Sequence, residues 1–145
     1  MTHQTRRIVV TGMGAITAAG RGVDSLWSAA RDGRSGVSEQ LFERYPRQRI
    51  TKTAHIKDFD PADHLSAQEI KTTDRFAQLA LVAAEEALKN AGIDTAVPLG
   101  PRTGAIIGSG IGGAWTTDNG NYSFYVTNER PDLMTIAKVM PNAAA

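Results

Sequence analysis

Two short apolar runs, each followed at once by glycines, constrain the fold of this chain more than any other feature. The first reads IVVTGMG, from Ile8 to Gly14, and the second reads TGAIIGSG, from Thr103 to Gly110. β-Branched runs of this length that stop at glycine are typical of strands buried on both faces of a parallel sheet. We therefore predict a buried strand in each run.

The strongest helical pattern lies between these runs, from Lys71 to Gly92, with Thr72, Thr73 and Asp74 as candidate caps. One face of this helix is apolar and rich in alanine: Phe76, Leu79, Ala80, Ala83, Ala87 and Ala91. A face of such small side chains predicts close packing against another backbone layer. Glu85 and Glu86 are assigned to the solvated side, and Gly92 predicts the end of the helix.

Weaker signals complete the coarse fold. SAQE, from Ser66 to Glu69, is a capping box, and Asp24 or Ser25 can cap a short helix that ends at Gly33. Between them we expect an irregular excursion with a short strand near Ile50. PDLMTIAKVMPNAAA begins a further helix, which we expect to continue to the end of the chain. Because strands alternate with helices, the pattern predicts an α/β fold with a parallel sheet.

The composition excludes several functional classes. Of the 145 residues, 41% are hydrophobic and 21% charged, as in a globular domain, and the net charge of +1 gives no field that would attract nucleic acid or an anionic membrane. No apolar run approaches the length of a membrane span. The absence of cysteine excludes disulfides, zinc thiolate sites and a cysteine nucleophile within this stretch. His3, His55 and His64 lack metal-ligand spacing, so we expect no metal, and we expect no cofactor. The absence of cysteine fits a cytoplasmic protein, which we also expect.

The second glycine cluster, GSGIGG, has the letters of a dinucleotide-binding loop. Such a loop must open a helix, so that backbone N–H groups face the pyrophosphate. Here Asn119-Gly120-Asn121 follows, and we expect it to break any helix. In the first cluster Thr17 stands where the motif requires glycine. We therefore predict that the glycines allow tight turns and close backbone approach, or form the wall of a pocket for another ligand. A small dinucleotide-binding domain is the less favoured alternative.

Several segments, taken in order, resemble the type II β-ketoacyl-acyl-carrier-protein synthases, which have the thiolase fold. They are RRIVVTGMGAIT, LWSAARDGRSGV, TDRFAQLALVAAEEALKNAG, GAIIGSGIGG and MPNAAA. The resemblance runs from Arg6 to Ala145. It implies an α-β-α-β-α layered architecture, of which residues 1–145 form an incomplete N-terminal half.

The resemblance also implies a function. Members of the family are homodimers that condense malonyl-carrier protein with an acyl thioester and release carbon dioxide, using a cysteine nucleophile, two histidines and a lysine. The family's cysteine lies beyond the position of Ala145. The resemblance therefore implies that this chain holds no catalytic residue and has no condensing activity alone. An alternative is a non-catalytic subunit of chain-length type, which shapes the tunnel of a partner synthase.

Residue by residue, the resemblance implies a pocket wall. Gly110, Ile111 and Gly112 match the segment beside the family's nucleophile, where Ile111 gates the acyl tunnel. Val139 matches a side chain that reaches the acyl pocket of the partner subunit. The region from Met134 to Ala145 matches the homodimer interface.

The resemblance further implies a docking surface for acyl carrier protein, with Lys71 and Arg130 as its basic residues. Neutral residues stand at other positions where elongation enzymes often carry basic ones: Gln68, Thr72, Leu133 and Met134. These departures favour a specialised paralogue over the housekeeping elongation enzyme.

Overall fold

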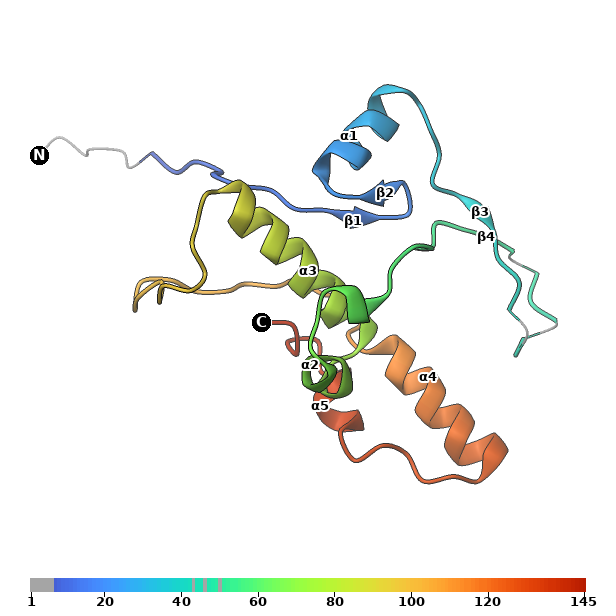
Figure 1. Ribbon diagram of the computed structural model, residues 1–145. Coiled ribbons are helices and arrows are strands. Elements are labelled where there is room, and N and C mark those ends of the chain that lie inside the picture. The colour runs from blue at the N-terminus through green and yellow to red at the C-terminus, as the bar shows by residue number, and fades with distance from the viewer. Residues whose placement is uncertain (1–6, 43, 46, 50) are drawn as a thin grey trace, which may run out of the picture.

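The computed structural model describes residues 7–42, 44–45, 47–49 and 51–145. Two pairs of short strands lie in the N-terminal part of the chain with one helix between them, and only helical elements follow along the described residues (Figure 1). In chain order they are β1 (Ile16–Thr17), β2 (Gly20–Arg21), α1 (Val23–Arg31), β3 (Ser38–Glu39), β4 (Lys52–Thr53), the 3-10 turn η1 (Pro61–Asp63), α2 (Ala67–Thr72), α3 (Arg75–Asn90), α4 (Ala114–Tyr122), the π-helical turn η2 (Ser123–Thr127) and α5 (Thr135–Val139).

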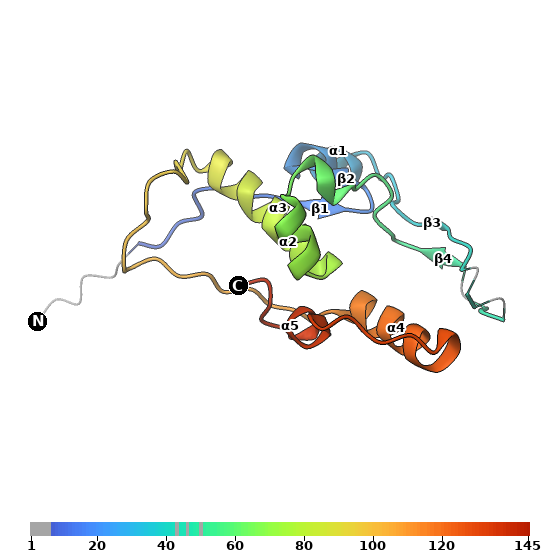
Figure 2. The ribbon, with the colours of Figure 1, turned by 60° about the horizontal axis from the view of Figure 1, so that its bottom comes forward.

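The elements form two layers (Figure 2). One holds α1, α2, α3 and the strand pairs; the other holds α4 and α5, which lie side by side. β1 pairs with β2 and β3 with β4, both antiparallel, with Ile16 opposite Arg21 and Ser38 opposite Thr53. The long connection after α3 runs out beyond the end of that helix and returns to α4 (Figure 1).

The alanine face of α3 packs directly on the first glycine cluster, as predicted. A side chain at Gly12 would collide with the backbone carbonyl of Ala87, and one at Gly14 would collide with that of Ala83. Only glycine lets the extended chain approach a helix this closely. The first glycines therefore serve packing, which confirms their predicted role.

Polar side chains of α3 fasten the same N-terminal segment. Glu86 accepts the N–H of Ala15 at 2.8 Å through Oε2 and the N–H of Val23 at 2.9 Å through Oε1. Asn90 Oδ1 accepts the N–H of Met13 at 3.1 Å. The assignment of Glu86 to the solvated side was wrong, because the Glu86 carboxylate faces the N-terminal segment and accepts an N–H from the first turn of α1.

Helix ends follow local signals in part. Ser66 and Glu69 form the predicted capping box, and α3 ends before Gly92, which has a φ of 69°. Gly33 follows α1 with a φ of 64°. The predicted Asp24 or Ser25 cap of α1 was wrong: its N-cap is Gly22, which makes no side-chain bond, and Glu86 supplies the acceptor.

Two further expectations concern short elements. Ile50 lies outside the described residues, and β4 begins shortly after it at Lys52. The predicted last helix exists as α5 but does not run to the end of the chain. It stops at Val139 because Met140 precedes Pro141 and takes an extended conformation, with a ψ of 131°.

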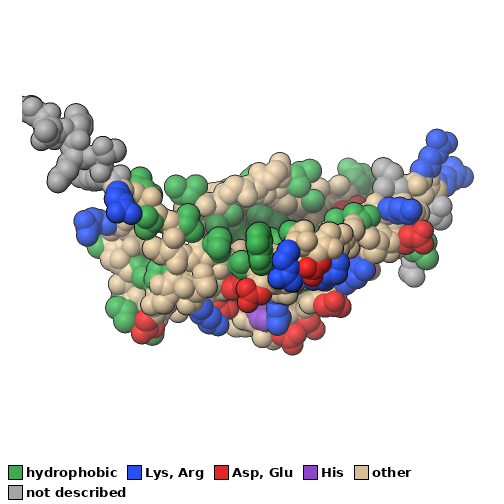
Figure 3. Space-filling model, turned by 90° about the horizontal axis from the view of Figure 1, so that it is seen from above, with side chains coloured by type: hydrophobic (Ala, Val, Ile, Leu, Met, Phe, Trp, Pro, Cys, Tyr) green, Lys and Arg blue, Asp and Glu red, His purple; other side chains and the backbone are tan. Residues whose placement is uncertain are grey.

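The two apolar runs do not form buried strands, and the predicted parallel sheet is absent from the described residues. The Ile8 side chain is 94% exposed and that of Ile106 is 98% exposed. A parallel strand needs neighbours at its edges and layers over its faces, and neither run pairs with another segment in the part of the chain described here. Apolar side chains consequently gather on an uncovered, hollowed surface (Figure 3).

Candidate functional site

The second glycine cluster does open a helix, contrary to the sequence prediction. α4 begins at Ala114, runs through Asn119-Gly120-Asn121 and continues into η2. A glycine within a helix costs only about 1 kcal/mol relative to alanine. Contacts from the rest of the fold outweigh that local preference.

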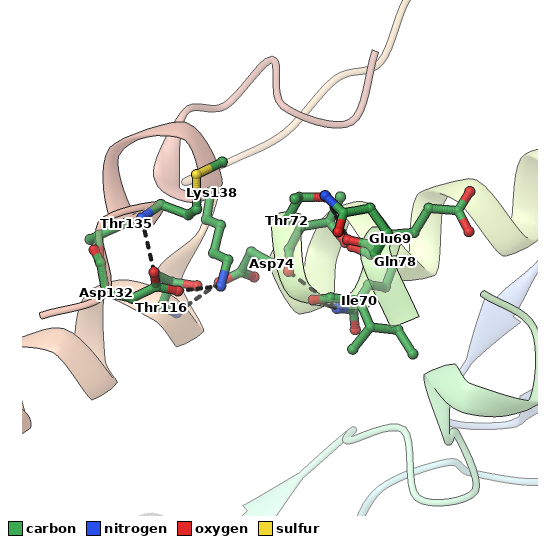
Figure 4. Close-up of polar contacts among 12 residues, drawn as sticks. Glu69, Ile70, Thr72, Asp74, Gln78, Thr116, Asp132, Thr135 and Lys138 are labelled. Atoms are coloured by element: carbon green, nitrogen blue, oxygen red, sulfur yellow. Dashed lines mark hydrogen bonds and ion pairs between the residues drawn. The ribbon is translucent and has the colours of Figure 1, made fainter. Parts of the chain in front are cut away.

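The first turn of α4 is already occupied by a carboxylate. Asp74 is 3% exposed, and its Oδ2 accepts the N–H of Thr116 at 2.7 Å (Figure 4). Its Oδ1 accepts the N–H of Phe76 at 3.1 Å and so caps α3. A buried negative charge at this turn would repel a pyrophosphate. The geometry therefore disfavours the dinucleotide alternative, although the helix that it requires is present.

The glycines between the extended run and α4 fall into two groups. Gly112, with a φ of 74°, and Gly113 press against the backbone of residues 138–141, where a side chain at either position would collide. The N–H of Gly113 donates to the carbonyl of Val139 at 3.2 Å, and the N–H of Gly112 donates to Ser109 Oγ at 2.9 Å. Gly108 and Gly110 have open space around them. Close approach to another backbone segment is thus confirmed for Gly112 and Gly113 but not for Gly108 and Gly110.

The structure places two of the predicted pocket residues, Gly112 and Val139, in contact. The backbone of Gly112 touches that of Val139, and Ile111 stands beside this contact with its side chain 77% exposed. Val139 is half-buried at the end of α5. It lines a cavity of about 280 Å³ with Gly120, Phe124 and Tyr125. Val139 therefore connects the two features: its backbone meets the glycine segment (residues 108–113), and it lines the apolar cavity.

The two predicted docking cations lie near one groove between the layers. The groove has a volume of about 440 Å³, and Arg130 lines it together with Ile70, Asp74, Trp115, Asp132 and Lys138. Lys71 is exposed in the last turn of α2. Its positive charge also reaches Asp132, where it helps to lower the pKa of that carboxyl.

Asp132 is one of two acidic residues that line this groove, with Asp74. It accepts Lys138 Nζ at 2.7 Å and the N–H of Met134 at 2.9 Å (Figure 4). The hydrogen bond from Lys138, followed by that from Met134, holds the pKa of Asp132 below its ordinary value of 3.8. The groove therefore presents mixed charge rather than a purely basic surface.

Sequence reasoning missed a contact between the irregular excursion and α4. Arg44 Nη1 donates to Asn119 Oδ1 at 2.7 Å and lies over the Tyr122 ring at 4.4 Å. The Tyr45 hydroxyl donates to Asp118, and this bond raises the pKa of Tyr45 above 10.0. No local signal marks these pairs, which are distant in sequence.

Two expected absences concern metals and membranes. Within the described residues, no group of histidine, aspartate and glutamate side chains is arranged to hold a metal ion. His3 lies outside those residues. No helix in the described ranges has the length and apolar character needed to cross a bilayer.

Comparison with known proteins identifies relatives of this chain by sequence. The chain is 37% identical over 113 residues to "3-oxoacyl-[acyl-carrier-protein] synthase 2" of Staphylococcus aureus (strain COL), covering 78% of this chain and 27% of that protein. It is 34% identical over 142 residues to "Nodulation protein E" of Rhizobium sp. (strain N33), covering 97% of this chain and 35% of that protein. The chain thus spans about a third or less of the length of these relatives.

A solved structure shares the arrangement of the backbone. The ishigamide ketosynthase/chain length factor superposes with a TM-score of 0.81 at 24% identity, over 93% of this chain and 34% of that chain. This likeness gives the fold, an α/β thiolase-like architecture present here in its N-terminal part. The family model described as "Beta-ketoacyl synthase, N-terminal domain" matches residues 5–145. The chain therefore belongs to the β-ketoacyl synthase family, and its sequence falls within that family's N-terminal domain.

Proposed function

We propose that this chain is the N-terminal part, residues 1–145, of an acyltransferase that condenses malonyl-carrier protein with an acyl thioester. In this proposal Gly110, Ile111, Gly112 and Val139 form part of the wall of the acyl pocket. The observation that carries it is the backbone contact of Gly112 and Gly113 with Val139, a residue that itself lines an apolar cavity.

Physical chemistry supports an alkyl ligand here. Burying each methylene of an acyl chain is worth about 0.8 kcal/mol, and Ile111 and Val139 offer apolar surface without charge. Gly110 has open space around it while Gly112 is held. We propose that Ile111 acts as a gate by turning about Gly110 while Gly112 stays fixed against α5.

The chain does not supply the reaction's nucleophile, since it contains no cysteine. Condensation needs a thiolate to hold the acyl group and donors for the developing oxyanion. We propose that these groups lie outside residues 1–145 and that the chain alone is inactive. The test is to incubate the 145-residue polypeptide with acyl-carrier protein and to measure its mass by mass spectrometry. Covalent transfer of an acyl group onto the polypeptide would contradict this proposal.

The proposed partners are acyl carrier protein and a second copy of the synthase. Lys71 and Arg130 are exposed beside the same groove and would meet an acidic carrier protein. The region from Met134 to Ala145 would form the homodimer interface. Binding of carrier protein should weaken when Lys71 and Arg130 become glutamate, and should stay unchanged when Arg102, exposed on the connection before the glycine segment, becomes glutamate.

The sharpest test of the pocket compares two exposed isoleucines in the complete reading frame that encodes this chain. Ile111→Ala is expected to change the length distribution of the acyl products, because it removes the proposed gate. Ile106→Ala removes the same atoms from a position outside the proposed wall and should leave the distribution unchanged. Equal products from both variants would remove the pocket assignment. A reading frame with no cysteine at the family's position would favour the non-catalytic subunit.

A further inference from the structure

One buried carboxylate links two helices that are far apart in the sequence. Asp74 Oδ1 accepts the N–H of Phe76 in α3 at 3.1 Å, and Asp74 Oδ2 accepts the N–H of Thr116 in α4 at 2.7 Å. An ionised carboxylate has two acceptor oxygens and no donor, so it can satisfy both amides at once. Figure 4 shows Asp74 between the two layers.

The second helix bonded to Asp74 begins where the glycine segment ends. Gly113 is the N-cap of α4, and because glycine has no side chain it cannot offer an acceptor to the free amides of the first turn. The carboxylate of Asp74 replaces that missing cap from another layer. It consequently fixes where α4 starts relative to α3.

The other attachments of the segment are made by backbone and by one hydroxyl. Gly113 donates to the carbonyl of Val139, and Gly112 donates to Ser109 Oγ. These bonds set the shape of the segment and its contact with α5. The bond from Asp74 to Thr116 is the one, among the hydrogen bonds described here, that ties the start of α4 to α3.

We propose that Asp74 is a positioning residue for the pocket wall, which holds residues 110–113 in place through Thr116. This inference rests on the proposed function in so far as those residues line an acyl pocket. Charge-assisted hydrogen bonds are the stronger class, and a buried one is shielded from water. Because Asp74 is fixed at the N-terminus of the long helix α3, its bond to Thr116 holds the start of α4, and with it Ile111, at a constant position relative to α3.

A matched residue allows capping to be separated from positioning. Asp60 also accepts the N–H two residues ahead, that of Ala62, at 2.9 Å through Oδ1. It is exposed and caps only η1. Serine is about as good an N-cap as aspartate, but its single short hydroxyl cannot serve two helices. Asp74→Ser therefore keeps the cap of α3 and removes the bond to Thr116.

The test is amide hydrogen exchange, followed by NMR, in the 145-residue chain. In Asp74→Ser the amides of Gly112, Gly113 and Thr116 should exchange about ten- to a hundredfold faster, as expected for loss of a hydrogen bond to a charged group. Phe76 should keep its protection. The amides of Ala15 and Val23, which donate to Glu86 of α3, should keep their exchange rates. The Asp60→Ser variant should change the exchange of none of these amides.

Several results overturn the proposal. Equal acceleration at Ala15, Val23 and Thr116 would make Asp74 a general determinant of stability. An unchanged Thr116, or no protection of Thr116 in the parent chain, would mean that the bond does not hold α4. Asp74→Asn repeats the comparison if the serine variant precipitates, and loss of structure in both variants also overturns the positioning role. None of these readouts involves an acyl chain, so failure of the pocket assignment with Ile111→Ala is distinguishable.

Discussion

Glu86 shows how a single side chain can organise a fold without any local signal in the sequence. Its neighbour Glu85 makes the ordinary helical pair with Lys89, at 2.6 Å on an exposed face. Glu86 turns to the other side and accepts two backbone amides, those of Ala15 and Val23. Adjacent residues with the same chemistry thus have different roles, because the helix presents them to different surroundings.

Replacing Glu86 by glutamine should destabilise the chain by about 1–3 kcal/mol, because one of the two amides would face an N–H donor instead of an acceptor. Glu85→Gln removes only an exposed ion pair and should change stability by less than about 1 kcal/mol. Urea denaturation, followed by circular dichroism, measures both. Equal effects of the two substitutions would mean that the contacts of Glu86 do not support the fold.

The carboxyl of Asp132 provides a test at the same scale. Its pKa is lowered, so any stability that it contributes is present above the unfolded-state pKa and is lost as pH falls through the lower folded-state value. A carboxyl titration by NMR should give a midpoint below 3.8. Lys138→Met should raise that midpoint more than Lys71→Met, because Lys138 donates directly to the carboxyl while Lys71 acts only through its charge. The reverse order would contradict the geometry of the groove.

At the scale of elements, the sequence predicted the helix starts and ends that are determined by residues close by in the chain. The capping box at Ser66 and the glycine ends of α1 and α3 were predicted because cap and αL signals act within a few residues. α4 was missed because its N-terminal acceptor, Asp74, comes from a distant part of the chain. The family resemblance named Gly112 and Val139 as pocket residues, the latter for the pocket of the partner subunit, but no pattern indicated that Gly112 would contact Val139 within one chain or that Asp74 would bond to α4.

The two halves of the glycine segment should respond differently to substitution. Gly112→Ala places a side chain where φ is positive and the backbone of Val139 blocks it, so we expect a cost of at least about 1–3 kcal/mol. Gly110→Ala has open space and should change stability by less than about 1 kcal/mol. Thermal unfolding of both variants compares them. Equal tolerance would show that the segment does not press on α5.

For the whole molecule, the main feature is the amount of apolar surface left uncovered. Exposed side chains occur on both extended runs: Ile8, Val9, Val10 and Ile106. Contiguous apolar patches of this kind are rare on stable monomers, and unpaired extended edges invite association. The uncovered surface and the absence of the predicted strands have one cause. Their sequence is suited to a buried sheet, but the described residues supply neither the neighbouring strands nor the covering layers.

The isolated chain should therefore associate with itself through these runs. Ile106→Lys places a charge in the middle of the second run and should raise the monomer fraction seen by sedimentation velocity, because a lysine opposes edge pairing and burial. Thr103→Lys adds the same charge at an exposed polar position at the start of that run, and should have a smaller effect. A parent chain that stays monomeric at all concentrations, or equal effects of the two lysines, would show that the exposed run is not an association surface. A response confined to Ile106→Lys would identify the uncovered apolar side of the second run as the association surface.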